Sequence, residues 1–105
     1  MIKYYLISGP VPNGTVAEMA LGSLVVPNGK KWTFSEIRPT LLTKTVINLY
    51  VQNEKVGTFD NLANADIQSR MCNWTLDSGQ VVQVTATNAD SSAHIIGVEF
   101  TINEQ

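Results

Sequence analysis

The chain has 105 residues, of which only 16 carry charge, seven Lys or Arg and nine Asp or Glu. The net charge of −2 argues against nucleic acid or an anionic membrane as a partner, because surfaces that bind phosphate need a surplus of Lys and Arg. The length predicts one domain over residues 1–105, and the hydrophobic content of 44% is that of a chain that folds.

The N-terminal half alternates short strand candidates with turn signals. Apolar and β-branched stretches predict strands at Ile2–Ile7, Leu24–Val26, Lys30–Ile37 and Thr45–Val51. The turn signals in this half are Gly9-Pro10, Pro12-Asn13-Gly14, Pro27-Asn28-Gly29 and Arg38-Pro39. One segment, Thr15–Gly22, fits a short helix and a strand equally well.

The C-terminal half shows a clearer period of two. It predicts strands at Glu54–Phe59, Arg70–Leu76, Gln80–Thr87 and Ala93–Ile102, with turns at Asp77-Ser78-Gly79 and over 88–92. Asn61–Asp66 has helical leanings of one or two turns. In the last strand candidate, Ile96, Val98, Phe100 and Ile102 share one face. Each alternating stretch is typical of a half-buried antiparallel strand.

These elements predict the fold class. Val, Ile and Thr total 29 residues, whereas Leu and Ala total 15, a balance that favours strands. About eight strands at a spacing of roughly 8–12 residues are typical of a β-sandwich or a small barrel. We therefore expect an all-β protein, an antiparallel β-sandwich or a small barrel.

The residues available for catalysis are few. The one histidine, His94, begins the inward row of the last predicted strand, and spacing pairs it with neither a nucleophile nor an acid. The one cysteine, Cys72, shares a face with Trp74, which predicts a buried thiol and allows no intrachain disulfide and no Cys-based zinc site. No nucleotide-binding loop, GxSxG or HExxH motif occurs. We expect no enzymatic activity and no cofactor.

Two binding hypotheses rest on side-chain chemistry. The oxygen-rich stretch Asp60–Asp66 offers ligands for Ca²⁺, although turn formation explains the same residues. Carbohydrate binding would use Trp32 and Tyr50 to stack sugar rings and Asn48, which shares a face with Tyr50, to form hydrogen bonds. Against this, Trp32 lies on one face with Phe34, as core aromatic residues do.

Three runs of the sequence resemble small jelly-roll domains of phage and viral structural proteins (capsid, decoration and appendage proteins). They are Leu24–Phe34 (LVVPNGKKWTF), Val46–Val51 (VINLYV) and Leu76–Val84 (LDSGQVVQV). The first is similar to a V-P-x-G-k-x-W strand start of such domains, and the last to their late L-x-x-G-x-x-V-x-V hairpin. The resemblance implies a non-enzymatic, oligomeric, particle-associated protein, and it transfers no functional residue.

The polar faces of the predicted strands are mostly uncharged, with 26 Asn, Thr and Ser in the chain. Such surfaces can pack against neighbours without burying unpaired ions. We therefore expect a structural protein that forms a homo-oligomer and contacts other particle proteins, with a glycan as the alternative partner. Met1–Ile7 has too short an apolar core for a signal peptide, which predicts synthesis in a host cytoplasm. The resemblance to virion proteins implies the virion as the location.

Overall fold

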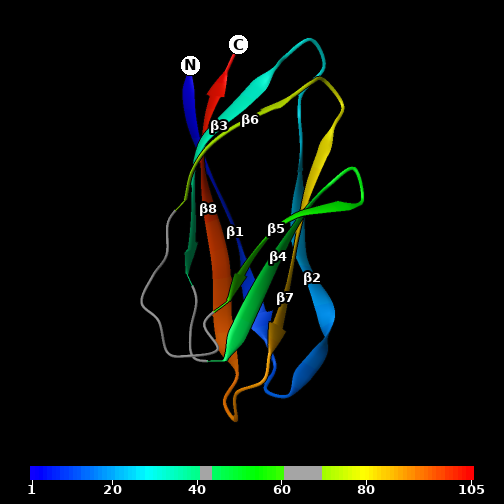
Figure 1. Cartoon of the computed structure of the whole chain (residues 1–105), viewed down its shortest axis with the longest axis vertical. Helices are drawn as coiled ribbons and strands as arrows, with labels where there is room; N and C mark the ends of the chain where they lie inside the picture. Colours follow the sequence, from blue (N-terminus) through cyan, green and yellow to red (C-terminus); the bar gives the residue numbers. More distant parts are fainter. Residues whose placement is uncertain (41–43, 61–69) are drawn as a thin grey trace.

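The computed structural model describes residues 1–40, 44–60 and 70–105, and for residues 60 and 70–73 the backbone alone. Within these residues, eight strands form two antiparallel sheets of four (Figure 1). The strands are β1 (Ile2–Val11), β2 (Thr15–Val25), β3 (Trp32–Thr40), β4 (Thr45–Val51), β5 (Glu54–Asp60), β6 (Arg70–Leu76), β7 (Val81–Asn88) and β8 (His94–Glu104). The predicted β-sandwich is confirmed. The described part of the chain has no helix long and apolar enough to span a membrane.

The strand order is that of a jelly roll, β1-β8-β3-β6 in one sheet and β2-β7-β4-β5 in the other. Strands pair as in one long folded hairpin, β1 with β8, β2 with β7, β3 with β6 and β4 with β5. The ladders β3–β8 and β4–β7 join these pairs into sheets. The two chain ends therefore lie side by side at one end of the sandwich, where the Met1 amino group donates to the Glu104 carbonyl (Figure 1).

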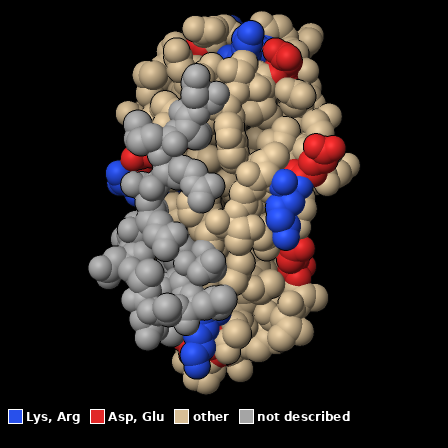
Figure 2. Space-filling model, in the orientation of Figure 1, with Lys and Arg blue, Asp and Glu red and all other residues tan. Residues whose placement is uncertain are grey.

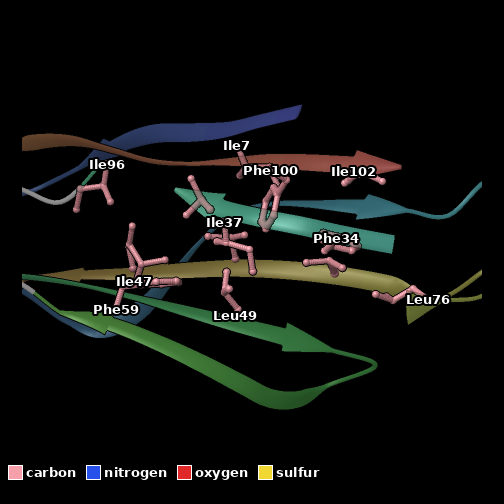
Figure 3. Close-up of a cluster of buried hydrophobic side chains, with 14 of the residues drawn as sticks. Ile7, Phe34, Ile37, Ile47, Leu49, Phe59, Leu76, Ile96, Phe100 and Ile102 are labelled. Atoms are coloured by element: carbon pink, nitrogen blue, oxygen red, sulfur yellow. The ribbon is translucent and has the colours of Figure 1, made fainter. Parts of the chain in front are cut away.

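The core lies between the sheets and is built from the predicted inward rows (Figure 3). Phe34 of β3 and Phe100 of β8 meet edge to face, with ring centres 5.5 Å apart. From the opposite sheet, Ile47 and Leu49 of β4 are fully buried. Other buried members are Ile37, Val82, Val84, Ala86, Ile96, Val98 and Ile102. The period-two pattern thus identified the buried face of the regular strands.

The repeated Val-Pro-Asn-Gly tetrapeptide forms turns in both places, as predicted. Gly14 and Gly29 have φ of 70° and 78°, in the left-handed region that glycine adopts without strain. In the second turn, Lys30 N–H donates to the Pro27 carbonyl at 3.1 Å. The β4–β5 hairpin uses Gln52 and Asn53, both at positive φ, as its two turn residues.

Two predicted turns are wrong, because Gly9-Pro10 lies inside β1 and Arg38-Pro39 lies inside β3. A proline has no N–H to donate, so it fits a strand only where no partner needs that donor. Pro10 stands on a strand at the edge of its sheet. Pro39 lies beyond Ile37, where the β3–β6 ladder ends.

The ambiguous segment Thr15–Gly22 is strand, and it continues into the predicted Leu24–Val26 strand as β2, which ends at Val25. Its ladder with β7 is irregular between Thr15 and Met19 and again between Ala20 and Gly22. Each irregularity shifts the alternation of faces. This explains why the segment lacks a clean period of two. Asn61–Asp66, with its predicted helical leaning, lies outside the described residues.

Candidate binding surfaces

The outer face of β1 carries an exposed apolar row, which we define as Ile2, Tyr4 and Leu6. Their exposed fractions are 54%, 70% and 65%. The intervening odd-numbered residues of β1 point toward the core, where Ile7 and Val11 are buried. Half of the eight large hydrophobic side chains found exposed in the described chain lie within its first six residues, since Met1 adds to the row. The surface hydrophobicity is therefore concentrated on this edge strand.

The outer face of the other sheet carries a hydrogen-bonded polar cluster, which we call the Glu18 cluster: Glu18, Asn48, Tyr50 and Thr85. The hydroxyls of Tyr50 and Thr85 both donate to Glu18 Oε1, at 2.5 Å and 2.7 Å. The Asn48 amide also helps to stabilise the Glu18 carboxylate and so to lower its pKa. Asn48 Oδ1 also accepts from the Thr58 hydroxyl at 2.9 Å. The cluster thus spans β2, β7 and β4 and reaches β5.

These contacts set the charge state of the Glu18 cluster. The Tyr50 hydroxyl, followed by the Thr85 hydroxyl, stabilises the Glu18 carboxylate and lowers its pKa. The same hydrogen bond raises the pKa of Tyr50, because the carboxylate opposes loss of the phenolic proton. Lys55 Nζ lies 5.8 Å from the centre of the Tyr50 ring and attracts Glu18. At neutral pH the cluster therefore has an ionised Glu18 and neutral Tyr50.

The structure brings together two of the three predicted sugar-binding residues, Tyr50 and Asn48. Trp32 lies elsewhere, on β3 of the other sheet, where its side chain is in the core and only 2% exposed. The Trp32 ring packs at 5.3 Å from that of Tyr5, and its indole N–H donates to Glu104 Oε2 at 2.8 Å. That bond, followed by the 2.9 Å ion pair with Lys3, lowers the pKa of Glu104. Trp32 therefore anchors the ends of the chain and presents no open ring face.

Sequence reasoning missed Glu18, the residue that joins the Glu18 cluster. Glu18 lies in the segment where helix and strand could not be separated, so its face was undefined. The missing signal was the register of β2 against β7, which pairs Ala20 with Thr85 and leaves Glu18 within reach of the Thr85 hydroxyl. Local sequence does not encode that register, because two irregularities interrupt it.

A shallow apolar hollow of about 290 Å³ opens beside Trp74, at the side of the sandwich opposite β1. Its described lining residues are Val51, Val56, Trp74, Thr75, Leu76 and Gln80. One side of the Trp74 ring packs on Phe34, with ring centres 6.4 Å apart. Trp74 is therefore a partly exposed residue that packs against the core and borders this hollow.

The remaining sequence candidates lie apart from both surfaces. His94 Nε2 is 2.7 Å from Asp90 Oδ2, at the end of the sandwich where β7 passes into β8, and this contact lowers the pKa of Asp90. Among the described residues, no hydroxyl or thiol is hydrogen-bonded to His94. The side chain of Cys72 and the proposed calcium loop Asp60–Asp66, apart from the backbone of Asp60, lie outside the described residues.

Among the side chains that the structure describes, which exclude those of residues 60 and 70–73, no group of His, Cys, Asp and Glu is arranged to hold a metal ion. Comparison with protein-family models and with curated proteins finds no match to this chain. Inference about function therefore depends on the two surfaces, the apolar row and the Glu18 cluster.

Proposed function

We propose that this protein is a non-enzymatic structural protein that self-associates, as a component of a virus particle. The observation that carries the proposal is the apolar row on β1. Large apolar side chains exposed together on one strand are stabilised when another protein surface covers them. The virion assignment is supported by the jelly-roll strand order, which viral capsid domains share with other proteins, and by the resemblance of the three sequence runs.

The rest of the surface supports association with other proteins. On the face shown in Figure 2, Lys, Arg, Asp and Glu are scattered and most of the described surface is uncharged. Charged side chains keep exposed strands from associating, and desolvating them opposes assembly. A surface that relies on Asn, Thr and Ser presents neither obstacle. Beside the apolar row, β8 presents Asn103 opposite Ile2, Thr101 opposite Tyr4 and one charged residue, Glu99, opposite Leu6.

The oligomeric state tests this proposal. Sedimentation velocity and light scattering, over concentrations from about 1 µM to about 1 mM, cover the range of ordinary protein affinities. We expect the mass to rise with concentration toward a defined multiple of 11.5 kDa. A protein that stays monomeric throughout this range would contradict self-association.

The Glu18 cluster supports carbohydrate binding as a second candidate function. Its amide, hydroxyl and carboxylate groups are those that bind sugar hydroxyls, and Tyr50 offers part of an aromatic ring beside them. A glycan array, followed by titration of any hit against wild type and Tyr50→Ala, tests this function. We expect the substitution to weaken glycan binding at least tenfold. Silence on the array would remove this candidate.

A further inference from the structure

β1 differs from the other three strands that end a described sheet. Its ladder with β8 runs unbroken from Ile2 to Val11. The ladders of β2, β5 and β6 each contain at least one irregularity. Natural proteins block exposed sheet edges with bulges and charges, because a regular edge pairs readily with another strand. β1 has no bulge, and its one charged side chain, Lys3, is paired with Glu104.

The hydrogen-bond pattern fixes which backbone groups of β1 are free. Met1 and Glu104 exchange both of their bonds, since Met1 N donates to Glu104 O and Glu104 N donates to Met1 O. Hydrogen-bonded pairs alternate with non-bonded pairs along an antiparallel ladder. The odd-numbered residues of β1 therefore bond to β8, and the N–H and C=O groups that point away from it belong to Ile2, Tyr4, Leu6 and Ser8. Pro10 has the same parity, so its missing N–H ends this free edge.

We propose that β1 is the self-association strand and that it pairs antiparallel with β1 of a second copy about a two-fold axis at Tyr5. This register bonds Ile2 to the partner's Ser8 and Tyr4 to the partner's Leu6, with the symmetric pairs repeated. It is the antiparallel register that uses all four free residues. A shift by one residue pair toward the N-terminus leaves Ser8 unpaired, and a shift the other way sets Ile2 against a proline. The inference rests on the proposed self-association and specifies its surface.

The side chains of β1 fit a second copy of the same strand. On the outer face, each Tyr4 lies beside the partner's Leu6, and such aromatic–aliphatic neighbours stabilise antiparallel strands. A two-fold axis repeats every charge, so a charged residue near it would face its own copy. Tyr4, Tyr5 and Leu6 carry none. Lys3 lies opposite the partner's Ile7 and is already neutralised by Glu104 of its own chain.

The area available also favours a second copy. A stable interface of standard size buries ~800 Å² on each partner, and this protein has 5717 Å² of accessible surface. β1 alone offers less than that. However, β2 lies beside β1. The side chain of Ile7 on β1 approaches Gly22 of β2 so closely that a Cβ added to Gly22 would lie 3.0 Å from it. Pairing of the two β1 strands brings the two β2 edges together, where Val16 and Val25 are exposed.

Disulfide trapping with two single variants tests the register. In this pairing, Tyr4→Cys of one copy is directly opposite Leu6→Cys of the other, at a Cα separation of about 5.5 Å that a disulfide can span. Each variant alone has its cysteines on a diagonal of about 7–8 Å, which is too long. Under mild oxidant we expect a cross-linked dimer from the mixture and none from either variant alone. The parent protein, with Cys72 as its thiol, is oxidised in parallel as the control.

Leu6→Pro separates this inference from the general proposal. Proline removes a donor that points away from β8, as native Pro10 does, so the fold is kept. We expect the dissociation constant to rise at least tenfold, whereas Val56→Pro on β5, another edge strand, leaves it within twofold if circular dichroism shows the fold intact. Association unchanged by Leu6→Pro, or cross-linking of Tyr4→Cys with itself, would overturn the β1 pairing alone. A wild-type protein that never associates would overturn the proposed function with it.

Discussion

The outer faces of the two sheets differ in how far their surface groups have partners within the same chain. On the Glu18 cluster, the hydroxyls of Tyr50, Thr85 and Thr58 all donate to acceptors of the same chain. On the apolar row, Ile2, Tyr4 and Leu6 are more than half exposed, and within the described part of the chain the backbone groups beside them pair with no further strand. The first face has its hydroxyl groups paired within one chain, whereas the second leaves apolar side chains exposed. Under the proposed self-association, this difference locates the interface on β1.

Neighbouring residues of β1 give the largest expected contrast. Ile7→Ala removes buried methylene and methyl groups and is expected to lower the free energy of unfolding by about 2–4 kcal/mol. Leu6→Ala removes an exposed side chain and is expected to change it by no more than about 0.5 kcal/mol in the monomer. Urea denaturation at a concentration where the protein is monomeric measures both. Equal losses would show that the row is part of the monomer's own core.

Raising the protein concentration is expected to make the exposed residue Leu6 matter for stability. Association stabilises the folded chain by mass action, so wild type is expected to unfold at a higher urea concentration when the protein concentration is raised a hundredfold. Leu6→Lys places a charge in the apolar row and is expected to abolish that rise. Val56→Lys, on the exposed side of β5, is the matched control and is expected to retain it. A rise retained by both variants would place the interface elsewhere.

The sequence predicted the inner faces better than the outer ones, for a physical reason. Burial selects apolar residues at every second position, and this pattern placed Ile96, Val98 and Phe100 on one inward face before any register was known. The Glu18 cluster depends on which strands become neighbours and in what register, which the local pattern does not contain. The two prolines placed in turns belong to strands for the same reason: whether a proline fits depends on its neighbours.

The Glu18–Tyr50 bond makes a smaller, spectroscopic prediction. Since Glu18 raises the pKa of Tyr50, the Glu18→Gln variant is expected to bring that pKa back toward the ordinary value of about 10. Ultraviolet titration of the three tyrosines follows the change, and Tyr50→Phe identifies the step that belongs to Tyr50. Tyr4→Phe is the control on the other sheet, and it is expected to leave the Tyr50 step unchanged. An unaltered Tyr50 step in Glu18→Gln would contradict the hydrogen bond.

The hydrogen bond between Tyr50 and Glu18 also makes the stability of the folded chain depend on pH. The pKa of Glu18 is lower in the folded chain than the unfolded value of about 4.3, so the folded chain favours the ionised form. The resulting stabilisation is present above that unfolded value and is lost as the pH falls through the lowered pKa. Asp90 and Glu104 act in the same direction, so the comparison must be with Glu18→Gln. The stability difference between the two proteins is expected to shrink from pH 7 to pH 3.

Salt gives the smallest expected effect and the sharpest distinction between the two faces. Association through the apolar row involves no ion pair between copies, so raising the salt from about 0.05 to about 0.5 M is expected to change the dissociation constant by less than about threefold. The attraction between Lys55 and Glu18 is exposed to solvent and is screened over the same range, so the pKa of Glu18 is expected to rise slightly. Sedimentation and NMR titration of the carboxylate measure the two responses on one sample. Association that weakens tenfold with salt would mean that charged residues hold the copies together. The only charged residue of β1 is Lys3, which is already paired with Glu104, and Glu99 lies one strand away on β8, opposite Leu6. Such a salt dependence would therefore contradict pairing through β1.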